Sequence, residues 1–175
     1  SSINGLLYIR GQSRDYDIWR QQGNTGWGWD DVLPYFLKSE NQERGANEFH
    51  SVGGPLSVSD IRIKLDILDE FQNAAAEMGI PKINDFNTGD NFGCDYFQVT
   101  EKNGLRCSTA VAYLNPAKKR SNLKVDVKAH VKQINFEGKK AVGISYWKND
   151  ELITVKANKE VILSAGSIGS PHILQ

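Results

Sequence analysis

One stretch of the chain carries apolar residues at helical spacing more clearly than any other. Intervals of three and four residues separate Leu65, Leu68, Phe71, Ala75 and Met78. This spacing places the five side chains on one face of a helix. A glycine and a proline follow within three residues and indicate the end of the helix. We therefore predict a helix over residues 65–78 whose apolar face packs on a sheet.

The last third of the chain alternates between apolar and polar residues, which is the pattern of half-buried strands. Turn sequences at residues 137–140 and 149–150 interrupt the alternation. The strands predicted in this way cover residues 123–136, 141–147 and 152–157. We expect a three-stranded meander with one buried and one solvated face. Lys128 and His130, which lie on the first of these strands, then need be no more than solvated side chains.

The final sixteen residues read as a strand, a tight turn and the start of a helix. Val161, Ile162 and Leu163 form a short buried-strand run, and Ser170-Pro171 is a favourable N-cap followed by proline. Between them, residues 164–169 carry little side chain, which lets ligand atoms approach the backbone closely. Such a turn suits a nucleotide, although small residues are also common in ordinary strand-to-helix connections.

Shorter elements are predicted nearer the N-terminus. Residues 6–9 form an apolar run, after which residues 10–17 are expected to turn the chain back to solvent. A short helix begun by Asp30 or Asp31 fits the residues around Pro34. Three tryptophans lie in or beside this region, Trp19, Trp27 and Trp29. We favour packing beneath a loop over a substrate cage for them, because each supplies a large apolar area.

A second group of short elements follows the predicted helix over residues 65–78. Residues 96–100 alternate enough to form a strand, and Asn103-Gly104 is a hairpin turn. Ser108 is then expected to cap a helix that reaches Leu114 and ends before Pro116. Together with the predicted meander, these elements make an α+β chain.

Composition narrows the classes of partner. Twenty-one basic residues balance twenty-one acidic ones, so no net charge favours nucleic acid or an anionic membrane surface. No apolar run approaches the ~20 residues of a membrane span, and no signal peptide is visible. Localisation stays open, with the cytoplasm favoured. Cys94 and Cys107 are too few for a disulfide scaffold or a zinc site, so we expect free thiols.

The sequence offers no catalytic constellation of its own. No Gly-x-Ser-x-Gly elbow is present for acyl transfer, and the three histidines are isolated from one another and from clustered carboxylates. Any chemistry must therefore be completed by groups outside these 175 residues.

Both ends of the chain resemble motifs of the glucose-methanol-choline (GMC) flavin oxidoreductases. Ser1-Ser-Ile-Asn-Gly5 is similar to the end of the family's flavin motif Gly-Gly-Ser-Ser-x-Ile-Asn-Gly. Residues 166–174 match a second motif, Gly-Ser-x-x-Ser-Pro-x-Ile-Leu. The internal segments 26–36, 53–56 and 103–114 also look like GMC segments, and they occur in the family's order.

The resemblance implies a central fragment of a GMC-type fold that binds FAD. It assigns residues 1–54 to the FAD-binding domain with its lid and linker. Residues 55–121 would belong to the antiparallel-sheet substrate domain, and residues 122–175 would return to the FAD-binding domain. By the same resemblance, the glycine-rich pyrophosphate turn lies before Ser1 and the catalytic histidine lies beyond Gln175, so that the fragment alone is expected to be inactive.

The resemblance also implies which residues meet the cofactor. Those expected on the flavin side are Asn4, Gly5, Leu6 and Leu7, and those expected on the adenosine side are Val131, Ala165 and Gly166. The Asn4 amide offers both a donor and an acceptor, which suits a flavin edge, although a turn asparagine that caps its own backbone has the same sequence signature.

Two further residues decide details of the expected site. Some GMC enzymes attach FAD covalently to a histidine at the position of Ile3, and an isoleucine cannot form that bond, so we expect noncovalent FAD. His50 matches a turn position of the family that is not the catalytic histidine, and we expect it to be structural.

The function expected from the resemblance is oxidation of the CH–OH group of a primary alcohol by hydride transfer to flavin, as in choline dehydrogenases. One alternative is a hydroxynitrile lyase-type GMC protein that performs no net redox reaction. Another is a fragment with only a folding or interaction role. The partners expected are a small-molecule alcohol and the remaining parts of its own chain, with self-association of the isolated fragment.

Overall fold

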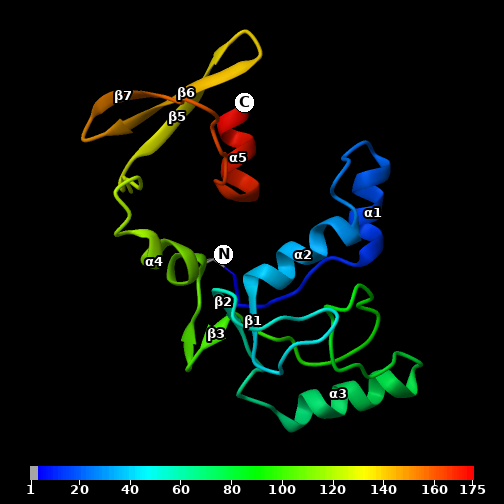
Figure 1. Cartoon of the computed structure of the whole chain (residues 1–175). Coiled ribbons are helices and arrows are strands. Elements are labelled where there is room, and N and C mark those ends of the chain that lie inside the picture. Colours follow the sequence, from blue (N-terminus) through cyan, green and yellow to red (C-terminus); the bar gives the residue numbers. More distant parts are fainter. Residues whose placement is uncertain (1–3) are drawn as a thin grey trace. The chain divides into compact units, whose positions relative to one another are not determined.

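The computed structural model describes residues 4–175 and forms two compact units, Ser1–Arg120 and Ser121–Gln175 (Figure 1). Both units combine helices with small sheets, which confirms the predicted α+β class. The assignment of three segments to flavin and substrate domains stays a prediction. Ile3, on which the expectation of noncovalent FAD depends, lies outside the described residues.

Two helices follow the N-terminal segment of the first unit, α1 (Ser13–Gln21) and α2 (Trp29–Ser39). An aspartate near the start of each helix accepts a hydrogen bond from a preceding amide, Asp15 from Gln12 (2.8 Å) and Asp31 from Gly28 (3.0 Å). The sequence predicted α2 but not α1. The expectation that residues 10–17 turn back to solvent is wrong for Arg10 and Tyr16, which are buried, and right for Arg14 and Asp15, which are exposed on a helix that begins at Ser13.

Aromatic side chains hold α1 against α2. The ring centroid of Tyr16 on α1 lies 5.7 Å from that of Trp29 and 5.9 Å from that of Phe36, both on α2, and 5.3 Å from that of Trp19 within α1. Trp29 is buried, whereas Trp19 and Trp27 are about half exposed and contact each other edge to face at 6.1 Å. These contacts agree with a packing role for the three tryptophans.

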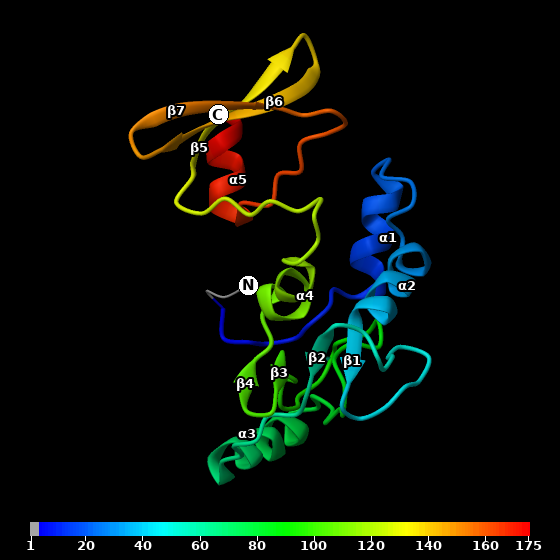
Figure 2. The same ribbon diagram turned by 60° about the vertical axis from the view of Figure 1, so that its left-hand side comes forward.

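Helix α3 (Asp66–Glu77) confirms the clearest prediction of the sequence. It lies along the outside of the first unit in both views (Figures 1 and 2). Of its apolar face, only Ala75 is buried, and Phe71 and Met78 are 66% and 83% exposed. The expected packing of this face on a sheet is therefore absent within residues 4–175.

The sheets of the first unit are very short. Strand β1 (Glu40–Gln42) follows α2 directly and pairs in parallel with β2 (Leu56–Val58), and β3 (Glu101–Lys102) pairs antiparallel with β4 (Leu105–Arg106). Asn103 and Gly104 join β3 to β4 with φ of 53° and 75°, as a type I′ hairpin turn requires. The predicted strand over residues 96–100 is reduced to isolated bridges at Val99.

The helical segment after this hairpin runs through a proline. A π-helical turn η1 (Ala110–Leu114) leads into α4 (Asn115–Ala117), so the expected end before Pro116 is wrong. Proline lacks the N–H that an α-helix needs at this position. The backbone adapts by widening, with the Asn115 amide donating to the Ala110 carbonyl five residues earlier. The Ser108 hydroxyl accepts a hydrogen bond from the Val111 amide (3.3 Å), as predicted for a cap.

The second unit contains the predicted meander. Strands β5 (His130–Glu137), β6 (Lys140–Lys148) and β7 (Glu151–Lys156) pair antiparallel in that order. The first strand begins at His130, seven residues later than the alternation suggested. Most of the meander is exposed, and its buried positions within the described residues lie on β6, so the expected buried face is largely open to solvent.

The end of the chain departs from its prediction. Residues 161–163 form no strand, since no neighbouring strand among residues 4–175 pairs with them. Helix α5 (Gly166–Leu174) begins one turn earlier than expected, and Pro171 lies inside it. Ser170 is therefore not the N-cap, and its hydroxyl instead accepts a hydrogen bond from the Ala165 amide (3.0 Å). α5 packs against β5.

Candidate functional site

The residues expected on the flavin side form an extended segment beside the strand region around Val99. The Thr100 amide donates to the Leu6 carbonyl and the Tyr8 amide donates to the Gln98 carbonyl, both at 2.8 Å. Leu6 has a φ of 74°, a left-handed conformation that a residue with a side chain adopts at a cost of about 1–3 kcal/mol. Strain of this kind often marks a functional position.

A hollow of about 210 Å³ lies against this segment. Asn4, Leu6 and Leu7 line it together with residues 106–109. Within the described residues, the backbone amides of Gly5, Leu6 and Leu7 donate no hydrogen bond, and the Asn4 side chain makes none. These groups remain available to the alternating donors and acceptors of a flavin edge, so the segment fits the group that the sequence implies.

The residues expected on the adenosine side belong to the second unit. Val131 on β5 and Ala165 before α5 line one hollow of about 480 Å³, although 34 residues separate them in sequence. Gly166 follows Ala165 with a φ of 84° but does not line the hollow. The structure thus brings Val131 and Ala165 together. Their contact with a cofactor stays a prediction.

Other side chains lining this hollow suit a planar heterocycle. Trp147 and Ile173 supply apolar surface, and His172 supplies a polar ring. The Lys132 ammonium lies 5.9 Å from the centre of the Trp147 ring, where a cation is attracted to the face of an indole. A lining of apolar side chains with a few polar groups is typical of small-molecule sites.

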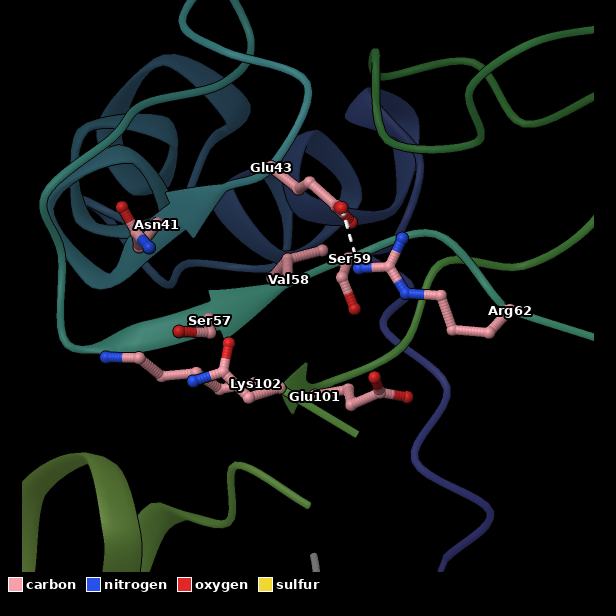
Figure 3. A pocket seen from close by; sticks show the side chains of 9 residues that line it. Asn41, Glu43, Ser57, Val58, Ser59, Arg62, Glu101 and Lys102 are labelled. Carbon is pink, nitrogen blue, oxygen red and sulfur yellow. Dashed lines mark hydrogen bonds and ion pairs between the residues drawn. The ribbon is translucent and has the colours of Figure 1, made fainter. Parts of the chain in front are cut away.

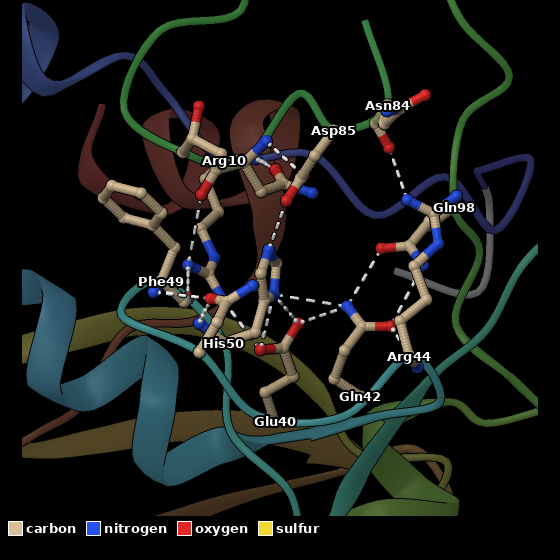
Figure 4. A network of polar contacts seen from close by, with 12 residues as sticks. Arg10, Glu40, Gln42, Arg44, Phe49, His50, Asn84, Asp85 and Gln98 are labelled. Carbon is tan, nitrogen blue, oxygen red and sulfur yellow. Dashed lines mark hydrogen bonds and ion pairs between the residues drawn. The ribbon is translucent and has the colours of Figure 1, made fainter.

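A buried polar network reaches Tyr8 and Arg10, which follow the segment expected on the flavin side (Figure 4). Its charged centre consists of Arg10, Glu40 and His50, whose side chains are 1%, 0% and 3% exposed. The Glu40 carboxylate accepts hydrogen bonds from Arg10 Nη2 and from His50 Nδ1, each at 3.0 Å. Sequence reasoning took Arg10 as solvent-exposed and did not single out Glu40.

His50 lies between two carboxylates, as Figure 4 shows. Its Nδ1 faces Glu40, and its Nε2 donates to Asp85 Oδ2 at 2.7 Å. Burial opposes a charge on His50, but the hydrogen bonds to Asp85 and Glu40 outweigh burial and raise the pKa of His50 to about 9. The expectation that His50 is structural rather than catalytic is consistent with these contacts.

The raised pKa predicts how stability depends on pH. Because the pKa of His50 rises from 6.5 to about 9 on folding, the stabilisation is complete below pH 6.5 and is lost as the pH rises through 9. Burial raises the pKa of Asp85, but hydrogen bonds from His50 and the Asn87 amide lower it overall, so its contribution is lost in acid instead. We expect thermal unfolding temperatures to fall from pH 6.5 to 9, and to fall less in His50→Gln. Equal alkaline slopes in the two proteins would contradict this assignment.

A third hollow, of about 230 Å³, was not suggested by the sequence (Figure 3). The ion pair of Glu43 with Arg62 (2.7 Å) lies beside Ser59. Ser59 is 6% exposed, and its hydroxyl is the one buried side-chain polar atom among the described residues without a hydrogen-bond partner.

This unpaired hydroxyl leads to a stability prediction. Removing a buried polar group that has no partner relieves its desolvation penalty, so Ser59→Ala should raise the free energy of unfolding by about 1 kcal/mol. Ser145 is the matched control, because it is also buried but bonds Asn135 and Thr154. Ser145→Ala should lower stability by a similar amount. Thermal unfolding of both variants checks the pair, and the same sign for both would contradict the prediction.

No group of three or more His, Cys, Asp or Glu side chains between residues 4 and 175 could hold a metal ion. None of the helices in this range combines the length and the apolar character that crossing a bilayer requires. Cys94 and Cys107 are free thiols, as expected.

Comparison with known proteins extends the resemblance seen in the motifs. A family model described as GMC oxidoreductase matches residues 1–175. Human mitochondrial choline dehydrogenase is 40% identical over 174 residues, which is 99% of this chain and 29% of the relative. The oxygen-dependent choline dehydrogenase of Vibrio vulnificus is 44% identical over 177 residues, or 100% of this chain and 32% of the relative. The chain therefore spans about a third of the length of these relatives.

Solved structures show the same fold. An FAD-dependent oxidoreductase from Chaetomium thermophilum is 30% identical with a TM-score of 0.88, covering 98% of this chain and 32% of that protein. Pyridoxine 4-oxidase from Mesorbium loti is 28% identical with the same TM-score, covering 98% and 34%. A fungal aryl-alcohol oxidase shares the fold at 20% identity, with a TM-score of 0.86, covering 98% and 32%.

Proposed function

This chain belongs to the GMC oxidoreductase family, and on that premise we propose that it is the central part of a flavin-dependent enzyme that oxidises a primary alcohol. The observation that carries the proposal is the 44% identity to a choline dehydrogenase along the whole chain. Choline is accordingly the first substrate to try. The relatives named above are all dehydrogenases, oxidases or oxidoreductases, and none of them supports the lyase alternative.

The residues of this chain would hold and orient the cofactor. Asn4 and the free amides of residues 5–7 would bind the flavin edge, and Val131 with Ala165 would bind the adenosine end. When bound, the flavin would supply the two-electron oxidation of the alcohol. The Leu6 and Leu7 side chains add apolar surface that keeps water from the ring. We further propose that FAD is bound noncovalently, because Ile3 offers no nucleophile for attachment.

The proposed function is tested in the full-length protein. Purified protein should be yellow, and anaerobic addition of choline or benzyl alcohol should bleach the visible flavin absorbance. Acid precipitation should release the flavin into the supernatant, which separates noncovalent from covalent attachment. A flavin that no primary alcohol bleaches would contradict alcohol oxidation and would favour the non-redox alternative.

The role of Asn4 gives a further prediction. Asn4→Ala removes a donor and an acceptor from the flavin edge, and each hydrogen bond is worth about 0.5–1.5 kcal/mol, so FAD affinity should fall about tenfold. Asn158→Ala is the matched control, because Asn158 is exposed and lies outside both cofactor hollows. Titration with FAD measures both. Unchanged FAD affinity, redox potential and turnover in Asn4→Ala would contradict the assignment of Asn4 to the flavin site.

A further inference from the structure

We propose that His50, Glu40 and Arg10 are positioning residues of the flavin site, which act by fixing the backbone of residues 6–10 against the rest of the first unit. The inference rests on the proposed function, since the flavin-side residues belong to this segment. It assigns to His50 a role beyond the structural one expected from the sequence.

The contacts form a continuous path from His50 to the segment. His50 donates to Glu40, and Glu40 accepts from the Arg10 guanidinium. Arg10 in turn donates through Nε to the Tyr8 hydroxyl (3.3 Å), and its own backbone amide donates to Asn87 Oδ1 (2.7 Å). The network therefore holds Tyr8, which directly follows Leu7, and Arg10, which lies two residues further on.

A second branch of the network reaches the segment through its backbone. The Gln42 amide group donates to Glu40 Oε1 (3.2 Å) and exchanges hydrogen bonds with Gln98 at 2.9 and 3.0 Å. The backbone carbonyl of Gln98 accepts a hydrogen bond from the Tyr8 backbone amide (2.8 Å). Both branches start at Glu40 and converge on Tyr8, so a displacement of Glu40 moves the segment from two sides.

Stability alone does not account for this arrangement. Burying charges costs several kcal/mol, and a hydrophobic replacement of a whole buried ion pair is often neutral or stabilising. What the charged groups add is a fixed orientation of residues 6–10. The planar Arg10 guanidinium donates to Glu40, to the Phe49 carbonyl (2.7 Å) and to Tyr8, which allows one orientation of the segment. The Arg10 guanidinium also lies 5.0 Å from the centre of the Phe36 ring.

The charge on His50 supports the same role. Two carboxylates face its ring, Glu40 from β1 and Asp85 from the loop after α3, while the positive groups nearby are Arg10 and Arg44. Loss of the His50 proton would leave Glu40 with one cationic partner fewer. FAD affinity of the intact protein should then weaken as the pH approaches 9.

The experiment uses the full-length flavoprotein and two variants. His50→Gln keeps a donor but cannot carry charge or span both carboxylates, and Asp85→Asn weakens the network from its more exposed side. We expect the FAD dissociation constant to rise about tenfold in each, with a shifted visible flavin spectrum. In His50→Gln, the alkaline weakening of FAD binding should also disappear. If His50→Gln fails to fold, Asp85→Asn still tests the proposal, because the Asp85 side chain is one-fifth exposed.

Ala75→Gly on α3 provides the control for stability. It removes a buried methyl group and weakens a helix by about 1 kcal/mol, but Ala75 takes part in none of the hydrogen bonds and ion pairs described for the network. This variant should unfold at lower temperature and keep the wild-type spectrum, FAD affinity and pH profile.

The outcomes separate the two proposals. Variants that fold and keep the wild-type FAD affinity, spectrum and pH profile would overturn the positioning role alone. Changes no larger than those in Ala75→Gly would do the same. A wild-type protein that binds no flavin at any pH would overturn the proposed function, and this inference with it.

Discussion

Glu40→Ala is expected to lower the free energy of unfolding by about 3–5 kcal/mol. The Glu40 side chain is fully buried, and its carboxylate faces both Arg10 and His50. Removing it leaves two cationic groups in the interior without their shared partner, and breaking a buried pair from one side is costly for that reason. Such a loss is a large share of the 5–15 kcal/mol that stabilises a typical domain.

Glu43→Ala is the matched control for this prediction. Glu43 lies three residues away and also binds an arginine, Arg62, but its side chain is 39% exposed. Exposed ion pairs contribute about 0–1 kcal/mol, so the control should change stability little. Thermal or denaturant unfolding of the two variants supplies the comparison. Similar losses at both positions would show that burial of Glu40 does not set its contribution.

The isolated 175-residue chain is expected neither to retain FAD nor to oxidise alcohols. The two hollows that we propose for the cofactor measure about 210 and 480 Å³ and belong to different units, so each would hold only a part of a dinucleotide. The contacts that this chain alone can make with FAD would have to offset a cost of several kcal/mol for immobilising a large flexible ligand. Absence of a general base typically forfeits a further ~10²–10⁴ in rate.

Exposed apolar side chains lead us to expect that the isolated chain also self-associates. Ile162, Ile168 and Leu174 are 79%, 85% and 62% exposed, and the apolar face of α3 is open as well. Exposed apolar surface on both units favours association. Gel filtration after incubation with excess FAD reads out both flavin retention and oligomeric state, with the full-length protein as control. A monomeric yellow fragment that reduces a dye with choline would overturn the prediction.

The sequence predicted the elements whose signals are local. The helix over residues 65–78 and the turns at 137–140 and 149–150 depend on spacing within a few residues, and all three were confirmed. The tail strand at residues 161–163 failed because a strand needs partners, which spacing alone cannot supply. The same reason explains the open face of the meander.

The buried network could not be predicted, because its members are far apart in sequence. Arg10 meets Asn87 across 77 residues and Glu40 across 30. An arginine beside a glycine is typical of a solvated turn, and only the assembled unit shows that it is enclosed. Family motifs supplied the residues expected to meet the cofactor, of which the structure joins Val131 to Ala165 in one hollow and Asn4 to Leu6 and Leu7 in another.

These long separations also set an order for folding during synthesis. The Leu6 carbonyl pairs with Thr100, 94 residues later, and Asn4 accepts a hydrogen bond from Arg106, 102 residues later. At ribosomal rates of about 5–20 residues per second, the first segment waits roughly 5–20 s for its partners. Its apolar residues are exposed to chaperones throughout that interval. The meander of the second unit pairs strands joined by two-residue turns, and it can form as soon as it emerges.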